Sequence, residues 1–324
     1  MKTKKINISF SGGRTSAWMT YYLLKKYKTK WCEDNKLHIG YSEEKNEIIH
    51  IIVTYANAGR EHENTLKFIR DCDFLYNFHT IWLESVFFVN TINGVIELNA
   101  ENIEDIKLED IKEGRTKDSF KVVDYQNCDR EGYQMEGMIV KYGLPNIRNA
   151  HCTRETKEKP IRYYLRSRGW LKNDYYTAIG IRIDEIDRIS VNKEKNKLIY
   201  PCIEKKMTKQ HILTFWGIND FDLNLNEELG NCVTCFKKSL YKLNKLSKTN
   251  KEIFDWNLKI EKKYSNWIPP NRITSRIKKG LEKSYDEKMF YFRERKTTEE
   301  IFLLKVDSQK YDDTESCEVF TKCE

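Results

Sequence analysis

Near its amino terminus the chain reads Ile6-Asn7-Ile8-Ser9-Phe10-Ser11-Gly12-Gly13-Arg14-Thr15-Ser16-Ala17-Trp18-Met19-Thr20. The apolar residues Ile6, Ile8 and Phe10 alternate with polar ones, and this period predicts a β-strand. From Ala17 onward the apolar residues follow a helical spacing that continues at Tyr21 and Leu24. The sequence therefore predicts a buried strand, a Ser-Gly-Gly turn and the opening of a helix.

The turn between this strand and this helix has the composition of an anion-binding site. Gly12 and Gly13 let backbone N–H groups approach an anion closely, and a helix N-terminus adds partial positive charge. The hydroxyls of Ser11, Thr15 and Ser16 would complete the cradle. No Gly-Lys-Ser/Thr closes the turn, so it is not a Walker A loop. An ordinary strand-to-helix turn that uses glycines for tightness is the alternative.

The overall composition is that of a globular protein. The chain has 324 residues, of which 40% are hydrophobic and 33% charged, enough for one large domain with appendages or for two domains. We see no signal peptide and no apolar run of membrane-spanning length, so we expect a cytoplasmic protein without a membrane partner. Nine cysteines without a secretory leader favour metal ligands or reactive thiols over disulfides. The net charge of +8 admits a nucleotide or nucleic-acid partner, although interspersed lysines and glutamates also describe a solvated surface.

A parallel sheet is indicated by the first third of the chain. Residues 48–55 form a near-continuous apolar run, typical of a strand that is covered on both faces. Strands are also expected at 6–10 and 78–83 with helices between them, an order that predicts a doubly wound, mainly parallel α/β sheet. Such sheets bind ligands at the carboxyl ends of their strands. The Ser11 turn and a second turn, Ala56-Asn57-Ala58-Gly59-Arg60-Glu61, both lie at such ends.

The remaining elements follow from local patterns. Residues 28–46 are polar and predict a loop or a small insertion, and residues 86–126 predict an excursion from the sheet. Helices are expected at 132–142, at 154–168 with a kink at Pro160, from the N-cap Thr208 to Trp216, and from 237 to about 264; further strands are expected at 175–181 and 302–306. The chain then divides into a nucleotide-binding region, 1–236, and a helical, lysine-rich C-terminal region, 237–324.

Three cysteines form the most specific chemical signal. Cys232 and Cys235 make a CxxC motif, whose spacing lets two thiolates hold one metal ion or cluster. Cys152 stands at the entrance to a helix, where the dipole and nearby basic residues favour a thiolate. With these three, a [4Fe–4S] cluster would keep an open fourth position, whereas a closed Zn²⁺ site would need Cys202 or His151. A redox dithiol and buried, unreactive thiols are the alternatives.

Two further positions suggest a chemical role. Arg182 follows the strand expected at 175–181, and a guanidinium there would hold a phosphate by paired hydrogen bonds. Cys317 and Cys323 lie in an acidic tail, where a thiol would shuttle sulfur or attack a bound sulfonucleotide. Neighbouring glutamates would raise the pKa of these thiols, and a disordered terminus is the alternative.

Taken in order, five motifs resemble those of the phosphoadenylyl-sulfate (PAPS) reductase-like family, within the PP-loop superfamily of adenine nucleotide alpha hydrolases. They are residues 11–16, 57–61, 151–157 with Pro160, 180–185 and 230–236. Residues 120–125 and 141–145 look similar to members of this family from phages and bacterial islands. The likeness covers about residues 5–240. It implies the PP-loop fold, with a helical C-terminal extension.

The resemblance also implies a nucleotide site. The phosphates of ATP or PAPS, with Mg²⁺, would be held by the first turn, at Ser11, Gly12, Gly13, Thr15 and Ser16. The adenosine would be flanked by the second turn, at Ala56, Asn57, Gly59 and Glu61. Arg182 would reach the phosphate or sulfate as a catalytic residue. Cys152, Cys232 and Cys235 would form the cluster or metal site.

The activity implied is ATP-dependent sulfur transfer, in which the enzyme adenylates its acceptor, releases pyrophosphate and lets sulfur displace AMP. The acceptor would be a nucleic acid or a nucleoside, the sulfur would come from a donor protein, and a homodimer is compatible with this reaction. The alternatives are a PAPS reductase that releases sulfite through Cys317 or Cys323, and a non-catalytic nucleotide-binding module with structural zinc. Two features differ from the family: Thr15 stands where many ATP-cleaving relatives carry Asp, and an adjacent Cys-Cys pair is missing. The second difference disfavours a dedicated assimilatory reductase.

Overall fold

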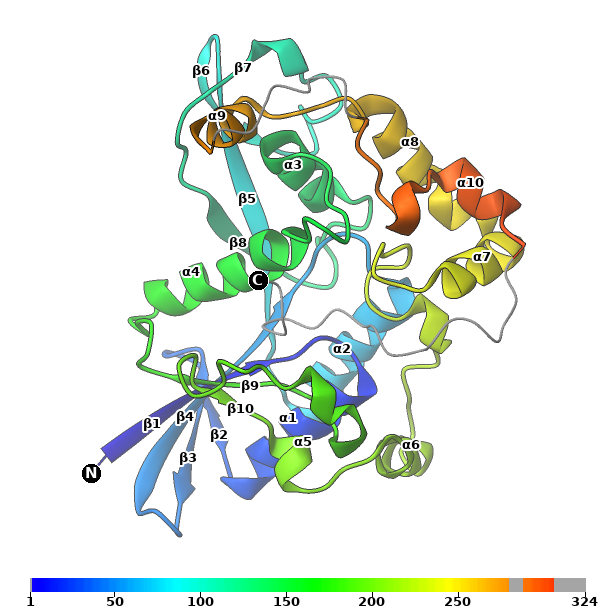
Figure 1. Ribbon diagram of the computed structural model, residues 1–324. Coiled ribbons are helices and arrows are strands. Elements are labelled where there is room, and N and C mark those ends of the chain that lie inside the picture. Colours follow the sequence, from blue (N-terminus) through cyan, green and yellow to red (C-terminus); the bar gives the residue numbers. More distant parts are fainter. Residues whose placement is uncertain (1, 280–287, 306–324) are drawn as a thin grey trace.

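A computed structural model describes residues 2–279 and 288–305 (Figure 1). The strands are β1 (Lys2–Ser9), β2 (Lys30–Cys32), β3 (Leu37–Ser42), β4 (Glu47–Ala56), β5 (Ile81–Thr91), β6 (Gly94–Leu98), β7 (Ile111–Lys112), β8 (Ser119–Val123), β9 (Tyr176–Ala178) and β10 (Leu198–Ile199). The α-helices are α1 (Arg14–Lys26), α2 (Glu63–Tyr76), α3 (Tyr133–Tyr142), α4 (Lys159–Ser167), α5 (Pro201–Glu204), α6 (Lys209–Gly217), α7 (Leu240–Thr249), α8 (Asp255–Tyr264), α9 (Pro270–Lys278) and α10 (Thr298–Leu303). A π-helix, η2 (Thr153–Glu158), precedes α4, and 3₁₀ turns include η3 (Ile183–Arg188), η4 (Glu227–Leu229) and η5 (Lys251–Phe254).

The centre of the fold is a parallel sheet with the order β5-β4-β1-β9-β10. β1 runs parallel to β4 along its whole length and parallel to β9 on its other side. The chain therefore builds the sheet outward in one direction up to β5 and then in the other direction from β9. The reversal lies between β1 and β9. In open α/β sheets, a crevice for ligands forms at this point, beyond the carboxyl ends of the two strands.

Helices cover both faces of this sheet, and the side chains of β4 show why. Ile49, Ile51, Val53 and Tyr55 point to one face, into a core shared with α1, α2 and α6. The intervening Ile52 and Ala56 point to the other face, where α4 covers them with Ile161, Tyr164 and Leu165. A strand that is buried on both faces needs apolar residues at successive positions, which explains the continuous apolar run. The chain is thus a mixed α/β protein with a central, mainly parallel sheet, as the sequence predicted.

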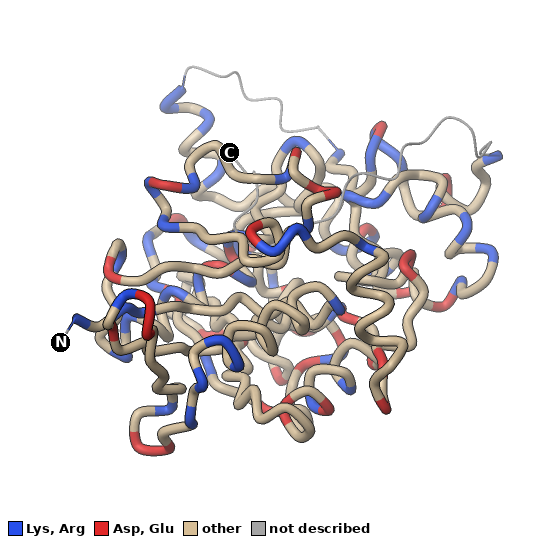
Figure 2. The backbone as a smooth tube through the Cα atoms, turned by 90° about the horizontal axis from the view of Figure 1, so that it is seen from below, with Lys and Arg blue, Asp and Glu red and all other residues tan. Residues whose placement is uncertain are grey.

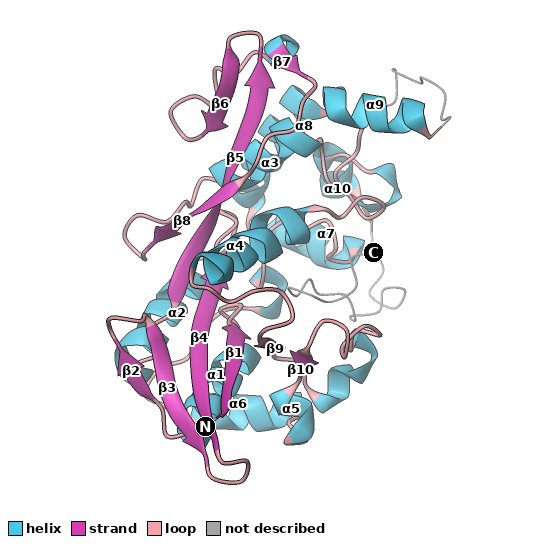
Figure 3. Cartoon of the chain, turned by 90° about the vertical axis from the view of Figure 1, so that its left-hand side faces the viewer, coloured by secondary structure: helices cyan, strands magenta, loops and turns pink. Residues whose placement is uncertain are grey.

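Two segments extend the sheet where the sequence predicted none. The segment 28–46, predicted as a loop or a small insertion, contains the hairpin of β2 and β3, which pairs antiparallel with the first half of β4. The predicted excursion 86–126 also differs. β5 continues to Thr91 and pairs antiparallel with β6, β7 and β8 (Figure 3). Edge strands of this kind keep polar residues on a solvated face, so a search for runs of apolar residues does not detect them.

The C-terminal helices pack against the middle of the chain. Helices α7, α8 and α10 share one core with α3 and with the second half of β5. The helix expected from 237 to 264 is two helices, because the chain breaks at Asn250 and passes through η5. The strand expected at 302–306 is wrong over its described part, since residues 302–303 belong to α10. A capping box opens that helix: the Glu300 N–H donates to Thr297 Oγ1 and the Thr297 N–H to Glu300 Oε2.

Several local predictions are confirmed. Helix α3 occupies the expected range, and the side chain of Thr208 caps α6 by accepting from the His211 N–H. The helix expected at 154–168 exists, but its first part, Thr153–Glu158, is π-helical, and Pro160 takes a first-turn position of α4. Basic and acidic residues are interspersed along the whole chain (Figure 2). Among the described residues, no helix has the length and apolarity needed to cross a membrane.

Candidate functional site

The turn after β1 leads directly into α1, as predicted. Gly13 is the N-cap of α1, and no side chain caps this end of the helix. The first N–H groups of α1 therefore keep their hydrogen-bonding capacity for another acceptor. The hydroxyls of Ser11 and Ser16 lie 3.0 Å apart, and Ser16 Oγ also donates to the Gly13 carbonyl at 3.0 Å. These contacts fold the turn around the helix N-terminus.

The two glycines of this turn have different structural roles. Gly12 has a φ of +77°, and a Cβ there would stand 2.6 Å from Thr65 Cγ2 on α2, so this position packs against a helix. A Cβ at Gly13 would meet only Ser11 Oγ, at 3.7 Å. The space beside Gly13 is therefore open. Gly13 is the glycine that admits a ligand, whereas Gly12 allows the turn to lie close to α2.

The segment after β9 meets the same turn from the other side. Gly180 lies so close to α1 that a Cβ on it would come within 2.9 Å of Ser16 Cα. Two residues later, the Arg182 guanidinium donates from Nη1 to Thr15 Oγ1 at 3.2 Å. Arg182 also pairs with Asp184 at 3.0 Å and with Glu185 at 3.2 Å. The structure thus brings Arg182 to the glycine turn, although 167 residues separate it from Thr15 in the sequence.

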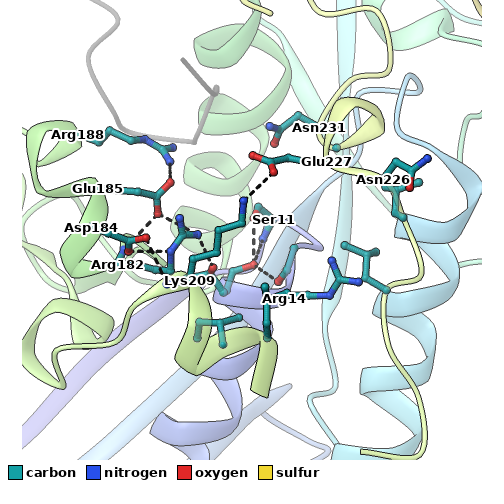
Figure 4. A pocket seen from close by; sticks show the side chains of 18 of the residues that line it. Ser11, Arg14, Arg182, Asp184, Glu185, Arg188, Lys209, Asn226, Glu227 and Asn231 are labelled. Atoms are coloured by element: carbon teal, nitrogen blue, oxygen red, sulfur yellow. Dashed lines mark hydrogen bonds and ion pairs between the residues drawn. The ribbon is translucent and has the colours of Figure 1, made fainter. Parts of the chain in front are cut away.

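A pocket of about 420 Å³ opens at this meeting point (Figure 4). Its floor is the glycine turn, with Ser11, Gly13, Thr15 and Ser16. Its lining residues also include Arg14, Arg182, Asp184, Glu185, Asp187, Arg188, Lys209, Glu227, Asn231, Cys235, Lys237, Lys238 and Lys242. One cavity at the strand-order reversal therefore joins the first, fourth and fifth sequence motifs. More basic than acidic side chains line it, which suits an anionic ligand.

Several carboxylates in and around the pocket are engaged in ion pairs. Arg14 holds Asp222 through two hydrogen bonds, of 2.6 Å from Nε and 2.5 Å from Nη2. Lys209 pairs with Glu227 at 2.8 Å. Burial alone would raise the pKa of Asp184, but the hydrogen bond and charge of Arg182 lower it. These contacts fix the pocket wall, and they make Asp184 an ion-pair partner of Arg182.

The second turn lies elsewhere. Asn57 is fully buried, and its amide donates to Glu84 Oε1 at 2.6 Å and to the Asp129 carbonyl at 2.8 Å. Neither it nor Ala56, Gly59 or Glu61 lines the pocket. Glu61 accepts from the N–H groups of Ala58 and Arg60, each at 3.1 Å. The turn expected to flank adenosine is, in this structure, closed by hydrogen bonds from its own N–H groups to the Glu61 carboxylate.

Glu61 also connects this turn to the cysteines. Its carboxylate pairs with Lys157 Nζ at 3.1 Å, and Cys232 Sγ lies 3.9 Å from Glu61 Oε1. The Val233 N–H donates to the Arg60 carbonyl at 2.9 Å, in an antiparallel bridge between Glu61 and Cys232. The second motif is therefore paired directly with the CxxC motif. Lys157 of η2, from the third motif, joins them through its ion pair with Glu61.

Two of the three predicted cysteines, Cys152 and Cys232, belong to the core that α3 shares with α7, α8 and α10, and Cys235 is buried next to Phe236 of that core. Cys152 and Cys235 are each 8% exposed, and Cys232 is half-buried beside them. Burial and the charges of Cys235, Cys232 and Cys152 hold the pKa of Tyr291 well above that of an ordinary phenol, so one hydroxyl senses all three sulfurs. Within residues 2–279 and 288–305, however, no three His, Cys, Asp or Glu side chains are placed so as to hold a metal ion. The sulfurs are gathered without being arranged as ligands, and iron or zinc binding stays a prediction.

The two proposed fourth ligands, Cys202 and His151, make other contacts. Cys202 is fully buried in the core under α1, with its sulfur 3.9 Å from the Thr15 carbonyl. The His151 ring contacts the Gly143 carbonyl through Nε2 at 3.2 Å, and burial lowers its pKa to about 4. Cys317 and Cys323, predicted as catalytic, lie outside the described residues.

Two residues near the cysteines were missed in the sequence. Lys238 is buried, and its ammonium donates to the carbonyls of Cys232 at 3.0 Å and Val233 at 2.8 Å. Burial lowers its pKa to about 8, against the opposing effect of Cys235 and Cys232. A lysine three positions after a CxxC motif could have been noticed. Tyr291 gives no such signal, because only the tertiary fold brings it to the cysteines.

Comparisons with known proteins add one relative. No protein-family model matches the chain, and no solved structure matches it. The chain is similar to a protein of Escherichia phage lambda described as "Uncharacterized nin region protein ORF290", with 28% identity over 236 residues. The match covers 73% of this chain and 67% of that protein. Its source agrees with a phage-type protein, and its name states no activity.

Proposed function

We propose that this protein is an ATP-dependent sulfur-transfer enzyme of the PP-loop, PAPS reductase-like type. The observation that carries the proposal is a single pocket whose floor is the uncapped N-terminus of α1 and whose wall includes Cys235. A nucleotide and a sulfur atom would thus meet in one cavity, beyond the carboxyl ends of β1 and β9.

The nucleotide phosphates would lie on the glycine turn. The N–H groups at the start of α1 and the hydroxyls of Ser11, Thr15 and Ser16 offer donors beside the open space at Gly13. Arg182, which already donates to Thr15, would extend this cradle with a cation. Hydrogen-bond donors that are fixed before the reaction stabilise developing negative charge without having to reorganise. This stabilisation is the main catalytic contribution of such a site. Mg²⁺ would accompany the nucleotide.

The reaction would proceed in two displacements. An oxygen of the acceptor attacks the α-phosphorus of ATP, and pyrophosphate leaves along the glycine turn. Nucleophilic sulfur at the oxidation level of sulfide, supplied by a donor protein, then attacks the acceptor carbon. The C–S bond forms as the C–O bond breaks, and AMP leaves with the acceptor oxygen. The lysines on the cysteine side of the pocket, Lys237, Lys238 and Lys242, favour an anionic acceptor, and a nucleic acid or nucleoside fits this charge.

The same excess of basic side chains supports a second candidate, a PAPS reductase. A PAPS molecule carries a 3′-phosphate in addition to its phosphosulfate, and the lysines would bind this extra group. Sulfite release would require a thiol from the tail, Cys317 or Cys323. A third candidate, a nucleotide-binding module with structural zinc, would bind ATP without turnover.

Calorimetry with ATP, PAPS and AMP side by side separates these candidates. We expect ATP to bind more tightly than AMP, and Arg182→Gln to weaken ATP binding by about tenfold or more, because a charge-assisted hydrogen bond contributes about 1.5–3 kcal/mol. Arg168→Gln is the matched control, since Arg168 lies at the end of α4 and contacts the Asn35 carbonyl at 3.0 Å, away from the pocket. Equal ATP binding by the wild type and Arg182→Gln would refute a phosphate site at this turn.

Turnover assays then distinguish the chemistry. Sulfur transfer predicts ATP–pyrophosphate exchange that persists when Cys317 and Cys323 are both replaced by Ser. A reductase predicts that this double variant loses sulfite release from PAPS. ATP binding with neither activity, together with stoichiometric zinc, would identify the non-catalytic module. Iron, sulfide and zinc analysis after anaerobic purification tests the metal prediction directly.

A further inference from the structure

The ion pair between Lys209 and Glu227 joins two walls of the pocket above the glycine turn. Lys209 is the first residue of α6, and Glu227 is the first residue of η4. Both line the pocket together with Ser11 and Gly13 of the glycine turn. In Figure 4 their side chains point toward one another, and Lys209 Nζ lies 2.8 Å from Glu227 Oε2. A cation of this pocket is therefore held by a carboxylate of the same pocket.

The backbone of Lys209 is fixed relative to the glycine turn. Its N–H donates to Asp184 Oδ2 at 3.3 Å, and the other oxygen of Asp184 accepts from Arg182 Nε at 3.0 Å. Arg182 in turn donates to the glycine turn. Further along α6, Trp216 Nε1 donates to the carbonyl of Arg14, the first residue of α1, at 2.9 Å. The root of the lysine side chain is thus tied to the same elements that form the floor of the pocket.

The end of the Lys209 side chain, by contrast, is weakly held. The exposed fraction of its side chain is 55%, and that of the Glu227 side chain is 64%. Because water and salt screen an ion pair at this exposure, such a pair shifts an equilibrium by a factor of about five or less. A lysine ammonium is a compact charge on a flexible stem. It can therefore leave Glu227 with little loss of stability when a stronger anionic partner enters the pocket.

We propose that Lys209 is a further phosphate-binding residue of this pocket, and that Glu227 holds its ammonium until a phosphate chain enters. The ammonium then turns from the carboxylate to the phosphates on the glycine turn, while the backbone of α6 keeps its place. Glu227 is thereby a competitor of the ligand. The inference deepens the proposed function, on which the identification of the ligand as ATP rests. The exchange itself requires only a chain of phosphates.

Calorimetry with inorganic pyrophosphate and with ATP tests the exchange through the two partners of the ion pair. We expect Lys209→Gln to weaken the binding of both ligands by about tenfold, because a charge-assisted contact is lost. Glu227→Gln should strengthen the binding of both by about two- to fivefold, because the competing ion pair is removed. An ion pair that only stabilised the pocket wall would give a loss of affinity in both variants, or no change in either.

Lys245 and Glu228 provide the matched control pair. Glu228 is the next residue of η4, and its carboxylate pairs with Lys245 of α7, but neither of these two residues lines the pocket. Lys245→Gln and Glu228→Gln change the same charges in the same region, and both should leave the two affinities unchanged. In the Lys209→Gln background, Glu227→Gln should have a smaller effect than in the wild type, because the competition requires the lysine.

Two results would overturn the proposal. One is unchanged pyrophosphate binding in Lys209→Gln, and the other is a Glu227→Gln variant that binds pyrophosphate no more tightly than the wild type. ATP turnover by the wild type together with either result would refute this inference and leave the proposed function standing. The expected shifts in pyrophosphate binding, without ATP–pyrophosphate exchange, would refute the proposed function and leave this inference standing.

Discussion

Replacing Gly180 by Ala tests whether the approach of the β9 segment to α1 sets the geometry of the phosphate turn. A Cβ at this position would lie 2.9 Å from Ser16 Cα and 3.0 Å from Ser16 N. Both atoms belong to the backbone of the first turn of α1, so no side-chain rotation can relieve the contact. Ordinary van der Waals contact begins at 3.4 Å, and the difference between 3.4 and 2.9 Å requires a shift of 0.5 Å.

The expected losses of stability and of ATP affinity follow from which atoms this 0.5 Å shift displaces. Overpacking a well-packed site costs about 1–3 kcal/mol in the free energy of unfolding. The same displacement moves the N-terminus of α1 relative to Arg182 and spoils the alignment of its donors, and misplacement of this size is costly in preorganised sites. We therefore expect Gly180→Ala to lower stability by about 2 kcal/mol and to weaken ATP binding by about tenfold.

Urea denaturation and ATP calorimetry measure the two effects, with Gly217→Ala as the matched control. Gly217 is the last residue of α6, and a Cβ there would meet nothing within 4 Å. In a helix, Ala is favoured over Gly by about 0.5–1 kcal/mol, so this control should be neutral or stabilising and should bind ATP normally. Gly180→Ala with the stability and affinity of the wild type would show that this close contact does not set the geometry of the turn.

Two further predictions concern buried charges. Lys238 has a pKa of about 8 in the folded protein, below its unfolded value of 10.5. Between these pH values the unfolded state binds more protons than the folded state. The contribution of this residue to the free energy of unfolding therefore rises with pH. Lys238→Met should flatten the rise from pH 8 to 10.5, by up to about 3 kcal/mol in urea denaturation; an unaltered pH profile would contradict this. For Arg14 and Asp222, a double-mutant cycle should give a coupling of about 1 kcal/mol at pH 7. Because the hydrogen bond and charge of Arg14 lower the pKa of Asp222 against the effect of burial, the coupling should be lost only as the pH falls through this lowered pKa; a coupling near zero at pH 7 would contradict it.

The sequence predicted the parts of this protein that local chemistry determines. The strand β1, the glycine turn and α1 follow from residues 6–20, because alternation, glycine and helical spacing each act over a few residues. The N-cap at Thr208 was found for the same reason, whereas Pro160, predicted to kink a helix over 154–168, lies in the first turn of α4. Arg182 was placed correctly at a strand end, because the order of elements puts successive parallel strands with their carboxyl ends on one edge.

What the sequence did not predict depends on contacts between distant segments. The hairpin of β2 and β3 was missed because its strands are short and its register on β4 stabilises it. Tyr291 reaches the cysteines through the packing of the segment 288–305, which no spacing encodes. The run at 302–304 is apolar and short, so it fits a strand or a helix equally well, and the capping box at Thr297 decides for the helix.

The second turn limits how a purine base could be recognised there. The Asn57 N–H donates to the Leu83 carbonyl, and the Gly59 N–H to Asn57 Oδ1. The N–H groups of Ala58 and Arg60 both donate to Glu61. Residues 57–59 are buried, and the Arg60 carbonyl already accepts from the Val233 N–H at 2.9 Å. In this conformation the turn therefore has no free N–H donor for a base, and contact with a base would require the turn to open. Reading the ring nitrogen of adenine would require Glu61 to release an N–H, and that release would loosen its contact with Cys232.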